Sequence, residues 1–319
     1  MTTPLLSVSH LSKSFPTSRG IVQAVDDVSF SIAAGEAFGL VGESGSGKST
    51  IGRLALGLIT PTAGDIRFSG QSINGLSERA LKPFRRQAQM VFQDPYSSLN
   101  PRLRVRDIIG EALDTHALAQ DRRDARIAEL LDMVGLNASH ASRYPHEFSG
   151  GQRQRIGIAR ALAVEPRLLI ADEPVSALDV SVQAQIITLL QDLRRHLGLA
   201  LLFISHDLDI VELLCERVAV LYLGRIMETG PTDQVMKTPR HPYSRALLAA
   251  VPKADPDAPR MQRLVSGDIP SPLNPPSGCV FRTRCFYAEG PCATDRPVLA
   301  PAEAGWQCAC LRDPLPEHE

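Results

Sequence analysis

The stretch from Gly42 to Thr50, Gly-Glu-Ser-Gly-Ser-Gly-Lys-Ser-Thr, has the residue types and spacing that bind a phosphate group. Its glycines let the backbone curl until several N–H groups point at one anion, and the helix that follows adds partial positive charge. Lys48 would reach the β- and γ-phosphates of a nucleotide, and the Ser49 hydroxyl would ligate Mg²⁺. The nucleotide contacts expected here are Gly42, Ser44, Gly45, Ser46, Gly47, Lys48, Ser49 and Thr50. An ordinary glycine-rich turn is the alternative.

Two carboxylates, Asp172 and Glu173, follow the apolar run 168–171, which is typical of a buried parallel strand. Asp172 can hold Mg²⁺ through its hydration shell, and Glu173 can accept a proton from an attacking water. The alternative is an exposed acidic turn before proline. Charged groups are rarely placed at the end of a buried strand unless they are paired or bind a metal, so the catalytic interpretation is favoured.

Two more polar side chains follow apolar runs: Gln93 after 90–92, and His206 after 200–204. Because α/β sheets bind ligands at strand carboxyl ends, both are candidate phosphate contacts. A solvated loop glutamine and a surface or core histidine remain the alternatives. Phe15 could stack on an adenine ring or belong to the core, and its spacing does not decide between them.

A second anion site is indicated by the four residues Ser149, Gly150, Gly151 and Gln152. Ser149 suits an N-cap, and two glycines leave the start of the following helix bare. Two phosphate-binding helix N-termini are more than one nucleotide bound within a single chain needs.

The elements that position these residues alternate between strands and helices. Residues 5–15 predict a strand with a turn at Pro16, and 21–32 predict one or two more strands. Residues 37–41 and 49–56 predict the strand and helix on either side of the phosphate loop. Helical periodicity replaces strand signals over 103–163, and a further helix is expected up to Leu197. Residues 217–228 predict a hairpin around Leu223-Gly224.

The whole chain has 319 residues, is 44% apolar and carries a formal net charge of −1. It is therefore long enough for one large or two ordinary domains, and no charge pattern predicts nucleic-acid binding. The longest apolar run has eight residues, whereas a membrane-spanning helix needs about 20. No secretory signal is recognised, so a cytoplasmic location is expected, where cysteines seldom form structural disulfides.

Taken in order, the phosphate loop, the Ser149 motif, the acidic strand and His206 resemble an ABC-type ATP-binding subunit over nearly the whole chain. The resemblance implies an α/β P-loop ATPase with a RecA-like core, an antiparallel β subdomain, a helical subdomain at about 101–163 and a loop-rich, cysteine-containing tail. It divides the chain into an ATPase domain, 1–252, and a C-terminal importer-type tail, 253–319.

The resemblance also implies a role for each motif. Gly42 to Thr50 is similar to the Walker A loop, and Gln93 to the Q-loop glutamine that touches Mg²⁺ and senses the membrane subunit. Asp172 is similar to the Walker B aspartate, Glu173 to the catalytic base and His206 to the switch histidine. Phe15 falls where the family stacks adenine.

In this family each nucleotide lies between the Walker A loop of one subunit and the signature motif of the other. Ser149 to Gln152 resembles that signature, and residues 176–179, ending in Asp179, resemble the D-loop. Because only one of each motif occurs here, these residues are expected to contact a nucleotide held by a second ATPase subunit.

A narrower resemblance, to the dipeptide, oligopeptide and nickel importers, comes from residues 91–102, 144–148 and 241–248. Asp94-Pro95-Tyr96 looks most like the F-type subunit. This implies a D-type paralogous ATPase subunit, two transmembrane permease subunits and an extracytoplasmic substrate-binding protein, with the chain peripheral at the cytoplasmic face of the inner membrane. Peptides are the expected cargo, and nickel or another small solute is the alternative.

Five of the six cysteines lie in the proline-rich tail. Their gaps are wider than the CxxC pairs of zinc ribbons, whereas iron–sulfur clusters tolerate varied spacing. Several members of the importer group carry such a cluster. By that resemblance the [4Fe-4S] ligands are Cys279, Cys285, Cys292 and Cys310, and Cys308 falls where an apolar residue is usual. Zinc or no metal remain the alternatives.

The sequence thus predicts an ATP hydrolase that uses ATP and Mg²⁺ to power peptide import. A soluble ABC ATPase acting on DNA would carry long coiled coils between Lys48 and Ser149, and none is found. A translation factor of this family would carry two cassettes in one chain, and the importer-type tail argues against an exporter.

Overall fold

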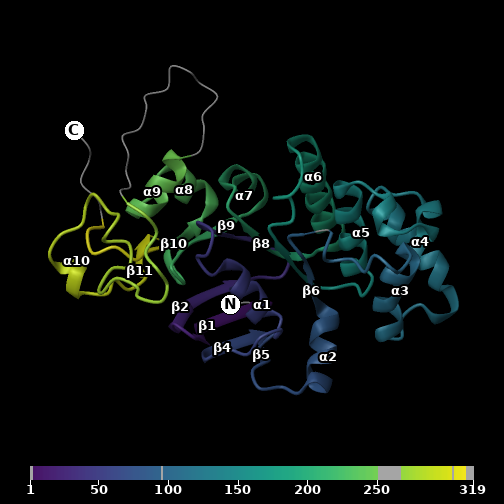
Figure 1. The fold of residues 1–319 in the computed structure, drawn as a ribbon, viewed down its shortest axis with the longest axis horizontal. Coiled ribbons are helices and arrows are strands. Elements are labelled where there is room, and N and C mark those ends of the chain that lie inside the picture. Colours follow the sequence, from purple (N-terminus) through teal and green to yellow (C-terminus); the bar gives the residue numbers. More distant parts are fainter. Residues whose placement is uncertain (1–2, 95, 251–266, 304, 314–319) are drawn as a thin grey trace.

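The computed structural model describes residues 3–94, 96–250, 267–303 and 305–313. Among these residues the central element is an eight-stranded sheet (Figure 1). In spatial order its strands are β11 (Ala300–Glu303), β12 (Trp306–Cys308), β10 (Arg225–Pro231), β9 (Arg217–Tyr222), β3 (Ala37–Val41), β8 (Ala200–Ser205), β7 (Leu168–Asp172) and β6 (Ala88–Val91). The five strands from β9 to β6 are parallel. Their carboxyl ends therefore meet at one edge of the sheet.

The parallel strands are buried on both faces, as their continuous apolar sequences predict. Successive residues of a strand point to opposite faces. In β8, Leu201 and Phe203 belong to one core cluster, and Leu202 and Ile204 belong to the other. The sheet thus separates two cores, and both hold its strand ends in place.

A smaller antiparallel sheet contributes to one of these cores. Its strands, in spatial order, are β2 (Gly20–Ile32), β1 (Leu6–Thr17), β4 (Ala63–Phe68) and β5 (Gln71–Ser72). The helices on this side are α1 (Lys48–Ala55) and α2 (Glu78–Gln87). The turn expected at Pro16 is wrong, because β1 continues through Pro16, which pairs with Ile21 near the end of the ribbon.

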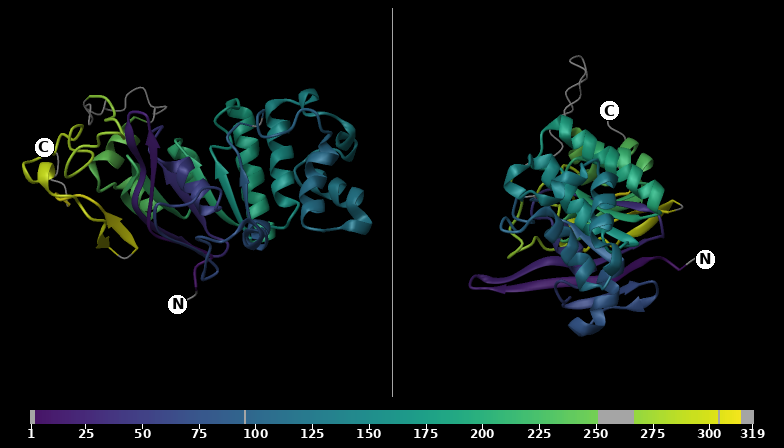
Figure 2. Two further views of the ribbon diagram at one scale, coloured as in Figure 1. Left: turned by 60° about the horizontal axis from the view of Figure 1, so that its bottom comes forward. Right: turned by 90° about the vertical axis from the view of Figure 1, so that its right-hand side faces the viewer.

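Helices dominate the region between β6 and β7, as the periodicity predicts. They are α3 (Val105–Thr115), α4 (Arg123–Met133) and α5 (Gly150–Leu162), with short 3-10 turns at Gln120–Arg122, Ala138–Ser142 and Pro145–Glu147. In α4 the buried residues are Ile127, Leu130 and Leu131, which share one face of the helix. Helix α6 (Val180–Leu197) follows β7. Figure 2 shows this helical region and the C-terminal tail at opposite ends of the molecule.

The hairpin of β9 and β10 turns at Leu223 and Gly224, which have positive φ angles. The other helices of this part are α7 (Leu208–Leu214), α8 (Thr232–Lys237) and α9 (Pro242–Ala249). The expected boundary at residues 252 and 253 lies outside the described residues, as does Pro95. No helix in the described ranges has the length and apolar character needed to cross a bilayer.

The tail contributes more regular structure than its proline-rich sequence indicates. It contains α10 (Pro291–Thr294) and the strand pair β11–β12, and β12 pairs with β10 through Glu228 and Thr229. The Trp306 indole N–H donates to Glu228 Oε1 at 2.9 Å. A Cβ on Gly230 would lie 2.8 Å from the Trp306 ring, so only glycine lets the indole pack this closely. The tail therefore extends the eight-stranded sheet beyond β10.

Candidate functional site

The phosphate loop follows β3 and leads into α1, as the strand–loop–helix pattern predicts. Gly42 and Gly47 have φ angles of +150° and +104°. A Cβ at these two positions would meet backbone oxygens, Leu221 O at 2.1 Å and Ala24 O at 2.3 Å, so both require glycine. Within the described residues Ser46 Oγ is buried without a hydrogen-bond partner. The loop thus presents an unsatisfied buried hydroxyl, which fits an anion site.

Lys48 is the first residue of α1 and is only 4% exposed. Its ammonium donates to the backbone carbonyls of Gly42, at 2.7 Å, and Glu43, at 3.0 Å. Burial lowers the pKa of Lys48, and the nearby carboxylates of Glu173, Asp172 and Glu43 oppose that shift. A phosphate in the loop would offer this buried cation stronger, charge-assisted hydrogen bonds.

Asp172 ends β7, where the apolar run predicts a strand end, and its side chain is buried. The Ser49 hydroxyl donates to Asp172 Oδ1 at 2.8 Å. Burial raises the pKa of Asp172, while the hydrogen bond from Ser49 lowers it. Mg²⁺ binds through carboxylates, water and substrate phosphates, so these two oxygen donors suit it.

Glu173 follows with a φ angle of 45°, in the left-handed region that costs a non-glycine residue energy. Its N–H donates to Ile204 O at 2.9 Å. Its carboxylate accepts a hydrogen bond from Gln93 Nε2 at 2.9 Å and lies 3.4 Å from His206 Nδ1. The other oxygen is 4.0 Å from Lys48 Nζ. Residues that follow three parallel strands, β3, β6 and β8, therefore converge on the carboxylate that follows a fourth, β7.

Phe15 lies on β1 with its ring 36% exposed. It belongs to neither core cluster, which removes the core alternative. It pairs with Val22 on β2, the strand whose Ala24 carbonyl abuts Gly47. The exposed ring is available to an aromatic base bound beside the phosphate loop.

Ser149 is the N-cap of α5, as its sequence predicts. Its hydroxyl accepts a hydrogen bond from Gln152 N at 3.3 Å, and its own N–H donates to Gln152 Oε1 at 3.1 Å. A Cβ on Gly151 would meet Val182 Cγ1 at 2.3 Å, and one on Gly150 would lie 3.2 Å from a Leu178 methyl. Glycine at 151 thus allows α5 to approach α6 closely.

This motif is not brought to the chain's own phosphate loop. Among the described residues no hydrogen bond joins Ser149–Gln152 to residues 42–50, and Figure 1 shows α5 with α3, α4 and α6, apart from α1. Asp179, expected in the D-loop, caps α6 by accepting from Val182 N at 3.0 Å. Ser149 is exposed at the start of α5, and Gly150 and Gln152 are half-buried, so this helix end is open to another molecule.

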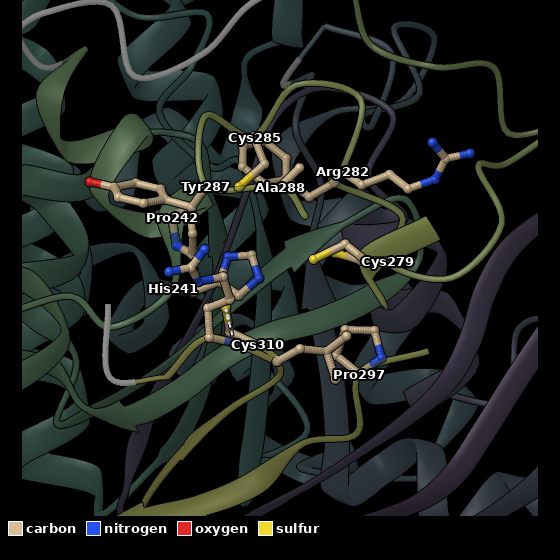
Figure 3. Close-up of a pocket in the computed structure, with 13 residues that line it drawn as sticks. His241, Pro242, Cys279, Arg282, Cys285, Tyr287, Ala288, Pro297 and Cys310 are labelled. Carbon is tan, nitrogen blue, oxygen red and sulfur yellow. Dashed lines mark hydrogen bonds between the residues drawn. The ribbon is translucent and has the colours of Figure 1, made fainter. Parts of the chain in front are cut away.

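Four tail cysteines, Cys279, Cys285, Cys292 and Cys310, line one pocket. Figure 3 shows three of them around it, together with His241. Burial raises the pKa of Cys285 to about 12 and that of Cys310 to about 11. In the described part of the chain no three His, Cys, Asp or Glu side chains are arranged to hold a single metal ion.

The other two cysteines lie elsewhere. Cys308 is buried on β12 and does not line the pocket. Cys215 is a buried member of one core cluster. All six are free thiols.

Several contacts join the tail to the rest of the described chain, and two that involve buried groups were not predicted from the sequence. Arg284 forms an ion pair with Glu43 of the phosphate loop, and Trp306 donates to the fully buried Glu228 of β10. The partners are 241 and 78 residues apart. No local pattern in the sequence connects residues at such separations.

Two family models match the chain. The model described as ABC transporter covers residues 25–176, and the one described as oligopeptide/dipeptide transporter, C-terminal region, covers 227–292. The oligopeptide transport ATP-binding protein OppF of Bacillus subtilis is 54% identical over 81% of this chain and 85% of its own length. A Brucella ovis protein, provisionally named a peptide import ATP-binding protein, is 54% identical over 98% of both chains.

Solved structures agree with these relatives. The dimeric, post-hydrolysis structure of the ATP-binding cassette MJ0796 with ADP and Pi has a TM-score of 0.65 and 30% identity, covering 71% of this chain and 98% of that one. The structure of cbiO1 from Clostridium perfringens, part of an ABC transporter complex, also has a TM-score of 0.65 and 30% identity, covering 74% and 91%.

Proposed function

The chain belongs to the ABC transporter ATP-binding proteins of the dipeptide, oligopeptide and nickel importer group, and we propose that it hydrolyses ATP to energise peptide import. The observation that carries the proposal is the convergence of Lys48, Gln93 and His206 on the Glu173 carboxylate beside the phosphate loop. That arrangement joins a phosphate-binding cation to a general base.

In the proposed reaction Lys48 binds the β- and γ-phosphates, and the rest of the loop from Gly42 to Thr50 surrounds them through its N–H groups. Phe15 stacks on the adenine. Glu173 orients the attacking water and accepts its proton, and His206 donates a hydrogen bond to the γ-phosphate.

Mg²⁺ would be held by Ser49, Asp172 and Gln93, and it supplies charge neutralisation on the transferring phosphoryl group when bound. The hydrogen bond between Ser49 and Asp172 supports this assignment. It places two oxygen atoms that can ligate Mg²⁺ next to each other, one on α1 and one at the end of β7. Gln93 also donates a hydrogen bond to Glu173, so this proposed Mg²⁺ ligand contacts the proposed base directly.

We propose that the catalytic site is completed by a second subunit. Ser149, Gly150, Gly151 and Gln152, with Asp179, would contact the nucleotide on the partner's phosphate loop. The exposed N-cap Ser149 of α5 and the dimeric state of the MJ0796 cassette support this arrangement. The second ATPase would be a D-type paralogue, with this chain the F-type member.

The wider assembly would contain two transmembrane permease subunits and an extracytoplasmic substrate-binding protein, with this chain peripheral at the cytoplasmic face of the inner membrane. The match of residues 227–292 to an oligopeptide/dipeptide transporter region supports this assignment.

Within the chain, we propose that residues 1–252 form the ATPase domain, with the helical subdomain at about 101–163, and that residues 253–319 form the tail.

The cysteine pocket is the proposed site of a [4Fe-4S] cluster. A single ion requires ligand atoms within about 2.3 Å of one point, whereas a multi-iron cluster spreads its thiolates more widely. Cys279, Cys285, Cys292 and Cys310 line one pocket, which supports a group shared by all four, while Cys308 lies outside it. The simplest role for such a group is to hold the loops of the tail together.

The proposal is tested by affinity purification of the tagged full-length chain from membranes, with identification of its partners and an iron assay on the same sample. We expect permease subunits and a second ATPase, and ATPase activity that a peptide-loaded binding protein stimulates. A Lys48→Ala version should lose that activity. Stimulation by nickel but not by peptide would favour a metal importer. Recovery without membrane proteins would favour a soluble ABC ATPase.

A further inference from the structure

Arg284 reaches from the tail into the phosphate loop. Its two terminal nitrogens donate to the two carboxylate oxygens of Glu43, at 2.7 Å and 3.0 Å. Such a two-pronged pair fixes direction as well as distance, because the planar guanidinium matches the carboxylate. Arg284 is the residue before Cys285, in the segment that lines the cysteine pocket.

Glu43 is held at three points. Its N–H donates to the Tyr243 hydroxyl at 3.0 Å, its carbonyl accepts from Lys48 at 3.0 Å, and Arg284 holds its side chain. It directly follows Gly42, whose carbonyl is the other acceptor of Lys48. The position of Glu43 therefore determines where the carbonyls that orient the Lys48 ammonium lie.

The surroundings make this ion pair stronger than one on the surface. Arg284 is 8% exposed, and its guanidinium lies 5.7 Å from the centre of the Tyr222 ring. The rings of Tyr222, Tyr243 and Phe281 contact one another beneath it. The side chain of Glu43 is 26% exposed, so water reaches one side of the pair, and removing Arg284 leaves a carboxylate that water compensates only in part.

We propose that Arg284 is a positioning residue of the nucleotide site, which holds the phosphate loop in its binding conformation through Glu43. The inference rests on the proposed ATP site and deepens it, because it makes the C-terminal tail part of that site. Arg284 does not touch the nucleotide; it acts on Lys48 through the backbone of Glu43.

Binding of MgATP to the purified full-length chain tests the proposal. Arg284→Gln should raise the dissociation constant about tenfold, a typical size for a coupled ion-pair network. The matched control is Arg296→Gln. Arg296 is also a tail arginine that pairs with the ATPase core, at Asp26, 3.3 Å away, but it does not contact the phosphate loop. The control should bind within about twofold of wild type.

Three further measurements separate positioning from other roles. In the assembled transporter, Arg284→Gln should raise KM for ATP and leave kcat at saturating ATP unchanged, whereas a folding defect would lower the active fraction. Arg284→Lys keeps the positive charge but loses the planar guanidinium, so its affinity for MgATP should lie between those of wild type and Arg284→Gln. If Arg284→Gln does not fold, Arg284→Lys serves as the test variant. The Glu43→Gln/Arg284→Gln double variant should bind as weakly as Arg284→Gln alone.

Wild-type affinity in a folded Arg284 variant would overturn the inference, as would an equal loss in Arg296→Gln. Recovery of affinity in the double variant would also overturn it, because Arg284 would then only neutralise charge. The proposed function itself fails by a different result, in which the wild-type chain does not bind MgATP or Lys48→Ala binds it unchanged.

Discussion

Replacing Glu173 by glutamine should lower turnover by about 10²- to 10⁴-fold and leave ATP binding intact. Glutamine has the same shape and keeps one oxygen that can accept the hydrogen bond from Gln93 Nε2, now made at 2.9 Å. It has no basic oxygen that can take a proton from water. The side chain would therefore still be held among Gln93 and His206 and would no longer act as a base.

The substitution removes a general base and a negative charge, and these two losses set the expected changes in hydrolysis rate and ATP affinity. Loss of a general base costs about 10²- to 10⁴-fold in rate, or about 3 to 5 kcal/mol at 1.36 kcal/mol per factor of ten. Loss of the negative charge 4.0 Å from Lys48 Nζ removes the electrostatic attraction between these two side chains in the site without nucleotide. Because phosphates would take over Lys48, ATP affinity should be equal to wild type or tighter.

The assay is single-turnover hydrolysis with the transporter complex in excess over radiolabelled ATP, alongside a dissociation constant for a fluorescent ATP analogue. Glu212→Gln, the same chemical change at an exposed position of α7, is the matched control and should behave as wild type. A single-turnover rate at the wild-type level in Glu173→Gln would refute the assignment of the base.

Three other changes have definite expected results. Glu228→Ala should lower the free energy of unfolding by about 3 kcal/mol, because buried N–H donors including the Trp306 indole lose their acceptor; an unchanged denaturant midpoint would contradict this. Cys310→Ser should lower the iron content of the purified complex and Cys308→Ser should not, since only Cys310 lines the pocket; equal losses would rule out the proposed ligand set. Because burial lowers the pKa of Lys48 and bound phosphates favour its cation, MgATP affinity should be highest below that pKa and fall as pH rises through it. Titration calorimetry across alkaline pH checks this, and an affinity that stays flat up to pH 10.5, the ordinary value for lysine, would contradict it.

Much of the core could be predicted because its signals are local. Buried parallel strands are continuous apolar runs, so the ends of β3, β7 and β8 could be placed directly from the sequence. The Ser149 cap needs only its own hydroxyl and a residue three positions later. Convergence of the polar groups then follows from parallel topology, without information on individual contacts.

The parts that were missed depend on partners outside their own segment, whether a neighbouring strand or a residue far along the chain. The strands β11 and β12 are short and lack clear alternation. β12 becomes a strand because β10 offers its hydrogen-bonding groups, and β11 then pairs with β12. The extended conformation of Pro16 is set by its partner strand rather than by its own preference for turns. The pairing of Arg284 with Glu43 brings together two charged residues, and the sequence around neither one indicates the other as its partner.

The attachment of β12 to β10 has a consequence for shortened versions of the protein. A chain that ends near residue 250, as a minimal catalytic fragment would, leaves one side of β10 with unpaired N–H and C=O groups in place of a covering strand. Unpaired strands of this kind recruit strands from other molecules. Such a fragment should self-associate or precipitate even with every catalytic motif present, so low activity in it would reflect insolubility rather than a missing catalytic residue.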